Sequence, residues 1–209
     1  SYYLIGAELG RFGHAHVAMP GGCNFGVRPI DQHVKGFAAM GATVREGDYI
    51  CAAAEGGRMK GANIYLDVVS VGATMNIMMA AVRAEGTTVI ENAAKEPEIV
   101  DLQNFLNKMG GKISGAGGST VIVEGVEKLH GVEYTPIKDR IEAGTFLIAA
   151  ASCGGEIEIE GVPQENIAAL LHKLRENGCK IHIKNDKITL KSNGRLRAAE
   201  LIETTPFPG

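Results

Sequence analysis

One helix ending recurs three times along the chain at nearly constant spacing. Helix-forming segments end at Gly41, Gly110 and Gly178, which are spaced about 70 residues apart. Each glycine stands where a helix C-terminus favours a left-handed residue, and a short predicted strand follows it. A period of about 70 residues is too long for a common solenoid and suits a compact βαβαββ unit. The sequence therefore predicts an α/β (α+β) protein with about three such units.

Apolar periodicity predicts the helices and strands of these units. Apolar residues at i, i+3, i+4 and i+7 indicate helices, one of them lined with methionines that we expect to fill the core. Strict alternation indicates strands, two of them joined by a hairpin turn at Asn185 and Asp186. The clearest predicted elements are helices at 97–109, at 163–177 and after Gly72, and strands at 14–19, 155–160, 180–184 and 187–191.

The composition excludes several classes of protein. With 209 residues, 45% of them apolar, the chain can bury a core without disulfides or metal staples. A net charge of -3 provides no basic field for nucleic acid or for an anionic membrane surface. No apolar run approaches the roughly 18 residues of a membrane span, and the first residues do not form a signal-peptide pattern. We therefore expect a cytoplasmic protein with no nucleic-acid or membrane partner.

The four cysteines occur singly, at positions 23, 51, 153 and 179. No CxxC pair and no histidine at ligand spacing accompanies them, so neither a metal site nor a disulfide framework is predicted. Cys51, Cys153 and Cys179 lie among apolar neighbours on predicted strands or helix ends. We expect these three side chains to be small buried residues.

Cys23 differs, because it lies in a glycine-rich loop at 20–29 between a predicted strand and a predicted helix. Glycines on both sides of it allow unusual backbone dihedrals and close approach to a ligand. Arg28 adds a fork-shaped donor for phosphate or carboxylate, beside the N–H groups at the helix start. A thiol with an ordinary pKa of about 8.5 acts as a general acid, or as a nucleophile if Arg28 or the helix end lowers that pKa. The residues themselves leave both roles open.

The loop carries a specific resemblance. The segment 20–31, PGGCNFGVRPID, resembles the active-site loop of the UDP-N-acetylglucosamine enolpyruvyl transferase family. The resemblance covers essentially the whole chain, whereas the sister family acting on shikimate 3-phosphate shares the fold and lacks this cysteine loop. The further segments that carry it are 67–74, 84–88, 96–101 and 139–146.

The resemblance implies a fold, a reaction and its substrates. Family members are inside-out α/β barrels with two lobes of three βαβαββ units. They transfer the enolpyruvyl group of phosphoenolpyruvate to the 3-hydroxyl of UDP-N-acetylglucosamine and release phosphate, the first committed step of peptidoglycan synthesis. No cofactor and no metal is implied. Residues 1–136 would form the later part of the first lobe, and 137–209 the first unit of the second.

The same resemblance assigns roles to individual residues. Cys23 is expected to donate a proton to the methylene carbon, to form an adduct with phosphoenolpyruvate and to be alkylated by fosfomycin. Arg28 is expected near the phosphates, and Asp31 as an acceptor for a base N–H. Substrate binding is expected from Arg28, Pro29, Ile30, Asp31, Gln32, Val68, Val69, Ser70 and Val71.

Simpler structural roles compete with several of these assignments. Ser70 reads equally well as an ordinary helix N-cap, and Asp31 as a first-turn carboxylate favourable to the helix dipole. We expect His33 to be a solvated helix residue. Charges at predicted strand-to-helix junctions are expected to serve an interface or a hinge; they are Glu96, Asp139 and Arg140.

The ends of the chain suggest a piece of a longer protein. Residues 1–7 read as the middle of an amphipathic helix, and 205–209 stop where the other units begin a new helix. The family's aspartate base and two phosphoenolpyruvate-binding residues would lie outside this chain, in the remainder of the same enzyme. The segment alone is therefore expected to be inactive. An inactive nucleotide-binding fragment is one alternative, and an unrelated thiol hydrolase or peroxidase with a base beside Cys23 is another.

Overall fold

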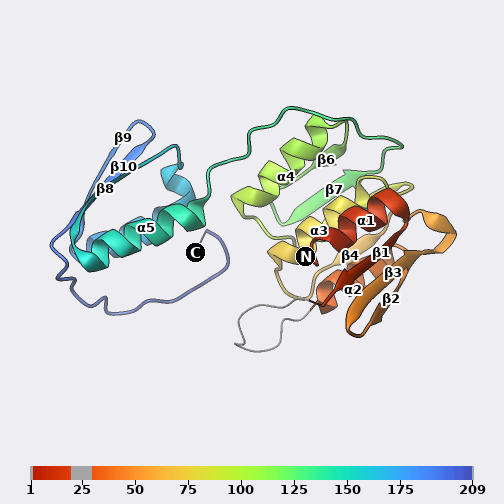
Figure 1. Ribbon diagram of the computed structural model, residues 1–209, viewed down its shortest axis with the longest axis horizontal. Coiled ribbons are helices and arrows are strands. Elements are labelled where there is room, and N and C mark those ends of the chain that lie inside the picture. Colours follow the sequence, from red (N-terminus) through yellow and green to blue (C-terminus); the bar gives the residue numbers. More distant parts are fainter. Residues whose placement is uncertain (1, 20–29, 209) are drawn as a thin grey trace. The chain divides into compact units, whose positions relative to one another are not determined.

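The computed structural model describes residues 2–19 and 30–208, so the cysteine loop lies outside the described residues. The chain divides into two compact units, Ser1–Tyr134 and Thr135–Gly209. Figure 1 shows the elements of each unit along the sequence. Among the helices that the structure describes, none is long and apolar enough to cross a membrane.

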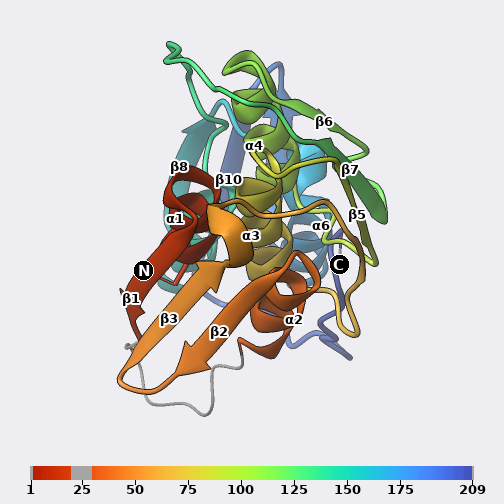
Figure 2. The same ribbon diagram turned by 90° about the vertical axis from the view of Figure 1, so that its right-hand side faces the viewer.

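The first unit begins with a three-stranded antiparallel sheet in the order β1-β3-β2. Figure 2 shows these strands side by side, with β3 in the middle. One sheet face turns inward, because the side chains of β3 alternate strictly between exposed and buried. The elements are α1 (Leu4–Phe12), β1 (His14–Ala18), α2 (Asp31–Ala39), β2 (Ala42–Glu46), β3 (Tyr49–Ala54) and the short helix η1 (Glu55–Gly57).

A complete βαβαββ unit follows. Its sheet has the order β4-β5-β7-β6, in which β4 and β5 are parallel and the other pairs antiparallel. The crossover helix α3 is apolar on nearly all sides, because it is buried against α1, α2 and α4. The elements are β4 (Asn63–Tyr65), α3 (Val71–Ala81), β5 (Thr87–Glu91), α4 (Pro97–Lys108), β6 (Lys112–Ser114) and β7 (Thr120–Glu124).

The second unit repeats the same strand connection. Its antiparallel sheet has the order β8-β10-β9, in which the last strand again lies between the other two. The order therefore recurs in β1-β3-β2, β5-β7-β6 and β8-β10-β9, which confirms the repeat predicted from the glycines. The elements are α5 (Arg140–Cys153), β8 (Gly155–Glu160), η2 (Gln164–Ile167), α6 (Ala168–Glu176), β9 (Lys180–Lys184) and β10 (Lys187–Ser192).

The three marker glycines take the left-handed conformation that the sequence predicted. Their φ angles are 85° at Gly41, 96° at Gly110 and 98° at Gly178. At Gly110 the N–H donates to the carbonyl of Asn107, and the next N–H donates to that of Leu106. This pair of bonds is the Schellman motif, which satisfies carbonyls left unpaired at a helix end.

Some local predictions are wrong. The helix expected over 163–177 is divided, because Ile167 has a φ of -134° and the regular helix starts only at Ala168. Cys179 is buried as expected, but Cys51 and Cys153 are exposed. Cys51 occupies an outward position of β3, on the sheet face opposite the helices, and Cys153 is the last residue of α5.

Candidate functional site

The two described segments that the sequence singled out lie next to each other in the first unit. Ile30, Asp31 and Gln32 form the start of α2, and 68–71 leads into α3. Hydrogen bonds between Gln32 and Asp67 join the two segments directly. Three predicted site residues lie outside the described residues; they are Cys23, Arg28 and Pro29.

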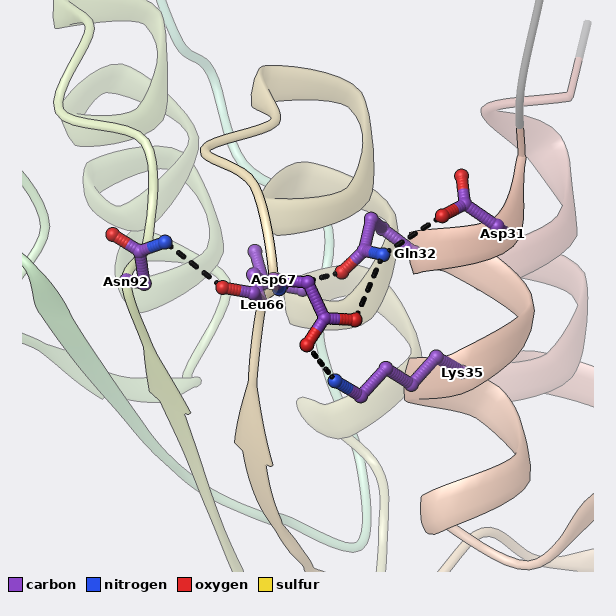
Figure 3. A network of polar contacts seen from close by, with 6 residues as sticks. All are labelled: Asp31, Gln32, Lys35, Leu66, Asp67 and Asn92. Carbon is purple, nitrogen blue, oxygen red and sulfur yellow. Dashed lines mark hydrogen bonds and ion pairs between the residues drawn. The ribbon is translucent and has the colours of Figure 1, made fainter.

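Gln32 is the centre of this junction, and its side chain is only 6% exposed. Its Oε1 accepts a hydrogen bond from the Asp67 backbone N–H at 2.9 Å. Its Nε2 donates to Asp31 Oδ2 at 2.8 Å and to Asp67 Oδ2 at 3.2 Å. Figure 3 shows these side chains facing one another across the space between α2 and the segment before α3.

Asp67 is held from a second direction by Lys35, one turn further along α2. The Lys35 Nζ donates to Asp67 Oδ1 at 2.7 Å, so each carboxylate oxygen of Asp67 has its own donor. The bond from Lys35, followed by the bond from Gln32, lowers the pKa of the Asp67 carboxyl. Because both members of the ion pair are exposed, the pair itself contributes little stability.

The other side of this segment is held by Asn92, which follows β5. Its Nδ2 donates to the carbonyl of Leu66 at 2.8 Å (Figure 3). Asn92 has a φ of 55°, in the left-handed region that asparagine tolerates better than most residues. The segment before α3 is therefore fixed between α2 and the strand β5.

Ser70 caps α3, as its simpler structural role predicted. Its Oγ accepts from the Ala73 N–H at 3.2 Å, and its carbonyl accepts from Thr74 Oγ1 at 2.8 Å. The first N–H groups of a helix have no acceptor within the helix, and together with the helix dipole they favour anions. Val68 and Val69 are exposed immediately before this turn, whereas Gly72, Ala73 and Thr74 within it are buried.

His33 is buried, which corrects the expectation of a solvated residue. Only 4% of it is exposed, and its Nδ1 lies 3.0 Å from Asn76 Nδ2. Asn76 Oδ1 accepts from the Gly6 N–H, so Nδ2 is the donor, and it also reaches the Tyr2 carbonyl. His33 Nδ1 is therefore an acceptor, and the neutral ring carries its proton on Nε2. Burial lowers the pKa of His33 to about 4, against a smaller opposing effect of Asp31.

The His33 ring also explains a glycine in the first turn of α3. A Cβ on Gly72 would lie 3.2 Å from His33 Nε2 and 3.2 Å from the Tyr3 hydroxyl. Few Cβ atoms have contacts this close, so a larger residue at position 72 would displace one of these rings. The start of α3 is thus packed tightly on the side that faces His33 and Tyr3.

One of the three junction charges, Asp139, has a local role at the start of a helix. Asp139 caps α5, because its Oδ1 accepts from the N–H groups of Ile141 and Glu142 at 2.8 and 3.0 Å. Glu96 precedes α4 and is 9% exposed. Within the described residues, its Oε2 has no hydrogen-bond partner.

Two observations limit the chemistry of the described residues. Across 2–19 and 30–208, no group of three or more His, Cys, Asp or Glu side chains is arranged to hold a metal ion. A hollow of about 760 Å³ lies between α1, α3 and α4, and none of the sequence-predicted residues lines it. Sequence reasoning missed three residues that organise the junction, Asp67, Asn92 and Asn76.

Comparison with known proteins gives close relatives over the whole chain. UDP-N-acetylglucosamine 1-carboxyvinyltransferase 2 of Clostridium acetobutylicum is 54% identical over 209 residues, which are 100% of this chain and 50% of the relative. UDP-N-acetylglucosamine 1-carboxyvinyltransferase 3 of Caldanaerobacter subterraneus subsp. tengcongensis is 52% identical over 210 residues, with the same two shares. The chain thus spans about half the length of the curated relatives it matches.

Solved structures share the fold. The enolpyruvyl transferase NikO from Streptomyces tendae matches with a TM-score of 0.73 at 22% identity, over 91% of this chain and 46% of that one. EPSP synthase from Acinetobacter baumannii matches with a TM-score of 0.65 at 21% identity, over 93% of this chain and 46% of that one. These likenesses confirm the predicted enolpyruvyl-transferase architecture.

A family model also matches nearly the complete chain. It is described as EPSP synthase (3-phosphoshikimate 1-carboxyvinyltransferase), and it covers residues 5–209. The repeated strand order, the solved structures and this match all indicate the same architecture. The chain therefore belongs to the EPSP synthase family of carboxyvinyltransferases.

Proposed function

We propose that the protein containing this chain transfers the enolpyruvyl group of phosphoenolpyruvate to the 3-hydroxyl of UDP-N-acetylglucosamine and releases phosphate. The observation that carries this proposal is the 54% identity, over all 209 residues, to a relative named for the UDP-N-acetylglucosamine reaction. Because this relative is named for UDP-N-acetylglucosamine, the identity favours the sugar nucleotide over shikimate 3-phosphate as the acceptor. Peptidoglycan synthesis in the cytoplasm, and with it a role in cell shape and division, belongs to the same proposal.

The chemistry is assigned to the loop at 20–29. Cys23 donates a proton to the methylene carbon of phosphoenolpyruvate, which makes the neighbouring carbon electrophilic. The acceptor hydroxyl then adds to that carbon and gives its proton to the base expected outside this chain, and the tetrahedral intermediate loses phosphate and one proton of its new methyl group to give the enolpyruvyl ether. Arg28 is assigned to the phosphates, where a planar guanidinium binds two oxygens at once.

The nucleotide is assigned to the two segments that Gln32 joins. Pro29, Ile30, Asp31 and Gln32 are assigned to the uridine side, with the Asp31 carboxylate as the acceptor of a base N–H. The first turn of α3, with Ser70 as its cap, binds the diphosphate through backbone N–H groups. This assignment is supported by the accessibility of Val68 and Val69 and by the neighbourhood of the two segments.

Selective alkylation tests the proposal. Fosfomycin is added to the full-length protein containing this chain, with UDP-N-acetylglucosamine present, and labelled peptides are located by mass spectrometry. We expect labelling at Cys23 and loss of turnover, whereas the exposed Cys51 and Cys153 remain unlabelled and serve as internal controls. Labelling that is equal at all exposed thiols, or turnover that survives the Cys23→Ala substitution, would contradict the assignment.

A second candidate is a nucleotide-binding segment without activity of its own. It is favoured by the length of the chain, about half that of its relatives, and by the position of both nucleotide segments within the first compact unit. We further propose that 1–136 belongs to the first lobe and 137–209 to the second. Calorimetry of the 209-residue chain with UDP-N-acetylglucosamine, beside a turnover assay of the same chain, tests this candidate: binding without turnover supports it, and turnover by this chain excludes it.

A further inference from the structure

We infer that the Gln32 side chain has a positioning role and is not itself a nucleotide contact: its buried amide fixes the Asp31 carboxylate and the segment 66–70 relative to each other. This inference rests on the proposed nucleotide-binding function, which it deepens. The sequence alone placed Gln32 among the substrate-binding residues. The structure gives its side chain a different set of partners.

The first argument is the hydrogen-bonding capacity of a single amide. A backbone N–H only donates and a carboxylate only accepts, so the Asp67 N–H must face Oε1, and the two carboxylates must face Nε2. Both polar atoms of the Gln32 side chain are therefore occupied by protein groups, in a residue that is 6% exposed. The side-chain amide has little capacity left for a ligand.

The second argument is what the amide holds. Asp31 is exposed at the start of α2, and only its Oδ2 is bound by Gln32. Among the described residues, Asp31 Oδ1 has no hydrogen bond, so this oxygen is available to a ligand while Oδ2 fixes the rotamer. An ordered carboxylate binds with a smaller loss of side-chain entropy than a mobile one.

The third argument is the span of the contact. Gln32 and Asp67 are separated by 35 positions in the sequence, and Asp67 lies three residues before the cap of α3. Asn92 and Lys35 hold the same segment from other sides. Of these three residues, only Gln32 contacts both Asp31 and Asp67. Loss of the Gln32 amide would therefore uncouple the proposed base-binding and diphosphate-binding segments.

Substitutions in the full-length protein containing this chain test the inference. Gln32→Leu removes the amide and keeps a side chain of similar size, so KM for UDP-N-acetylglucosamine should rise about tenfold, with kcat changed less than twofold. Gln32→Glu places a third carboxylate against Asp31 and Asp67, and should raise KM further. Adding Asp67→Asn to Gln32→Glu supplies an N–H donor across the contact between positions 32 and 67 and should recover part of the lost affinity, because the repulsion from Asp31 remains.

The matched control is Gln103 on α4, whose Oε1 accepts from the Ala116 N–H at 3.0 Å. Gln103→Leu removes the same kind of bond away from the site and should leave KM within about twofold, with a similar change in melting temperature. If wild-type protein neither binds nor turns over UDP-N-acetylglucosamine, the proposed function is wrong and this inference fails with it.

Two results would overturn the inference alone. One is a working wild-type enzyme whose KM does not change in Gln32→Leu. The other is a KM increase in Gln32→Glu that Asp67→Asn does not reduce. If Gln32→Leu does not fold, the comparison of Gln32→Glu with and without Asp67→Asn still tests the inference. A positioning role of the amide requires that KM falls again when the second substitution supplies an N–H donor.

Discussion

Acidification should destabilise the protein through one buried side chain, His33. Burial lowers its pKa to about 4, whereas a histidine in the unfolded chain titrates near 6.5. Between these values the unfolded state binds more protons than the folded state, so stability falls as the pH falls from about 6.5 to about 4. The linkage relation gives a loss of about 2 kcal/mol at pH 5 and about 3 kcal/mol at pH 4.

Urea unfolding at pH 7 and pH 5 measures this effect. Gln in place of His33 keeps an acceptor for Asn76 and removes the titration, so wild type should lose about 2 kcal/mol more than His33→Gln between the two pH values. His182 is exposed on β9, and His182→Gln should therefore follow the wild type. Because its pKa is lowered, Asp67 becomes protonated only in a more acidic range, so its titration does not obscure the comparison between pH 7 and pH 5.

Nitrogen NMR provides an independent measurement on the unmodified protein. We expect a neutral His33 ring above pH 5, with its proton on Nε2 and Nδ1 accepting from Asn76. A His33 that titrates near 6.5, or equal pH slopes for wild type and His33→Gln, would refute the reasoning.

Two further predictions concern the packing of the first unit, each measured by chemical denaturation. Ser70→Ala removes the cap of α3 and should cost about 1 kcal/mol of unfolding free energy, whereas Ser70→Asn should retain most of it; an unchanged midpoint in Ser70→Ala would contradict the capping role. Gly6→Ala places a Cβ into the Asn76 backbone and should cost about 3 kcal/mol, whereas Gly131→Ala points into open space and should change stability by less than about 0.5 kcal/mol. Equal effects of the two glycine substitutions would show that α1 and α3 are not packed so closely.

Several features of the fold could be predicted from the sequence because their causes are local. A glycine at a helix end adopts positive φ wherever the helix stops, and Gly41, Gly110 and Gly178 do so after three helices, each before a strand of a different sheet. The alternation in 155–160 and the Asn185 turn likewise specify strand and hairpin without reference to distant residues. Repetition of these local signals was sufficient to predict the repeated unit.

The environments of single side chains could not be predicted in this way. His33 lies on a helix whose sequence suits either solvent or core, and it is buried because Asn76, 43 positions away, packs against it. Cys51 lies among apolar residues, yet it is exposed because it occupies an outward position of β3, on the sheet face that is not buried in the described part of the chain. Burial depends on which elements pack together, and that choice is made by contacts distant in sequence.

The candidate site shows the same division. The sequence by itself determined the loop motif, the repeat and the two segments at 30–32 and 68–71. Only the tertiary structure decided that Asp67 and Asn92 organise these segments and that the Gln32 amide forms hydrogen bonds with protein groups. The physical reason is that a hydrogen-bonding side chain has a fixed number of donors and acceptors, and only the folded chain determines which neighbours occupy them.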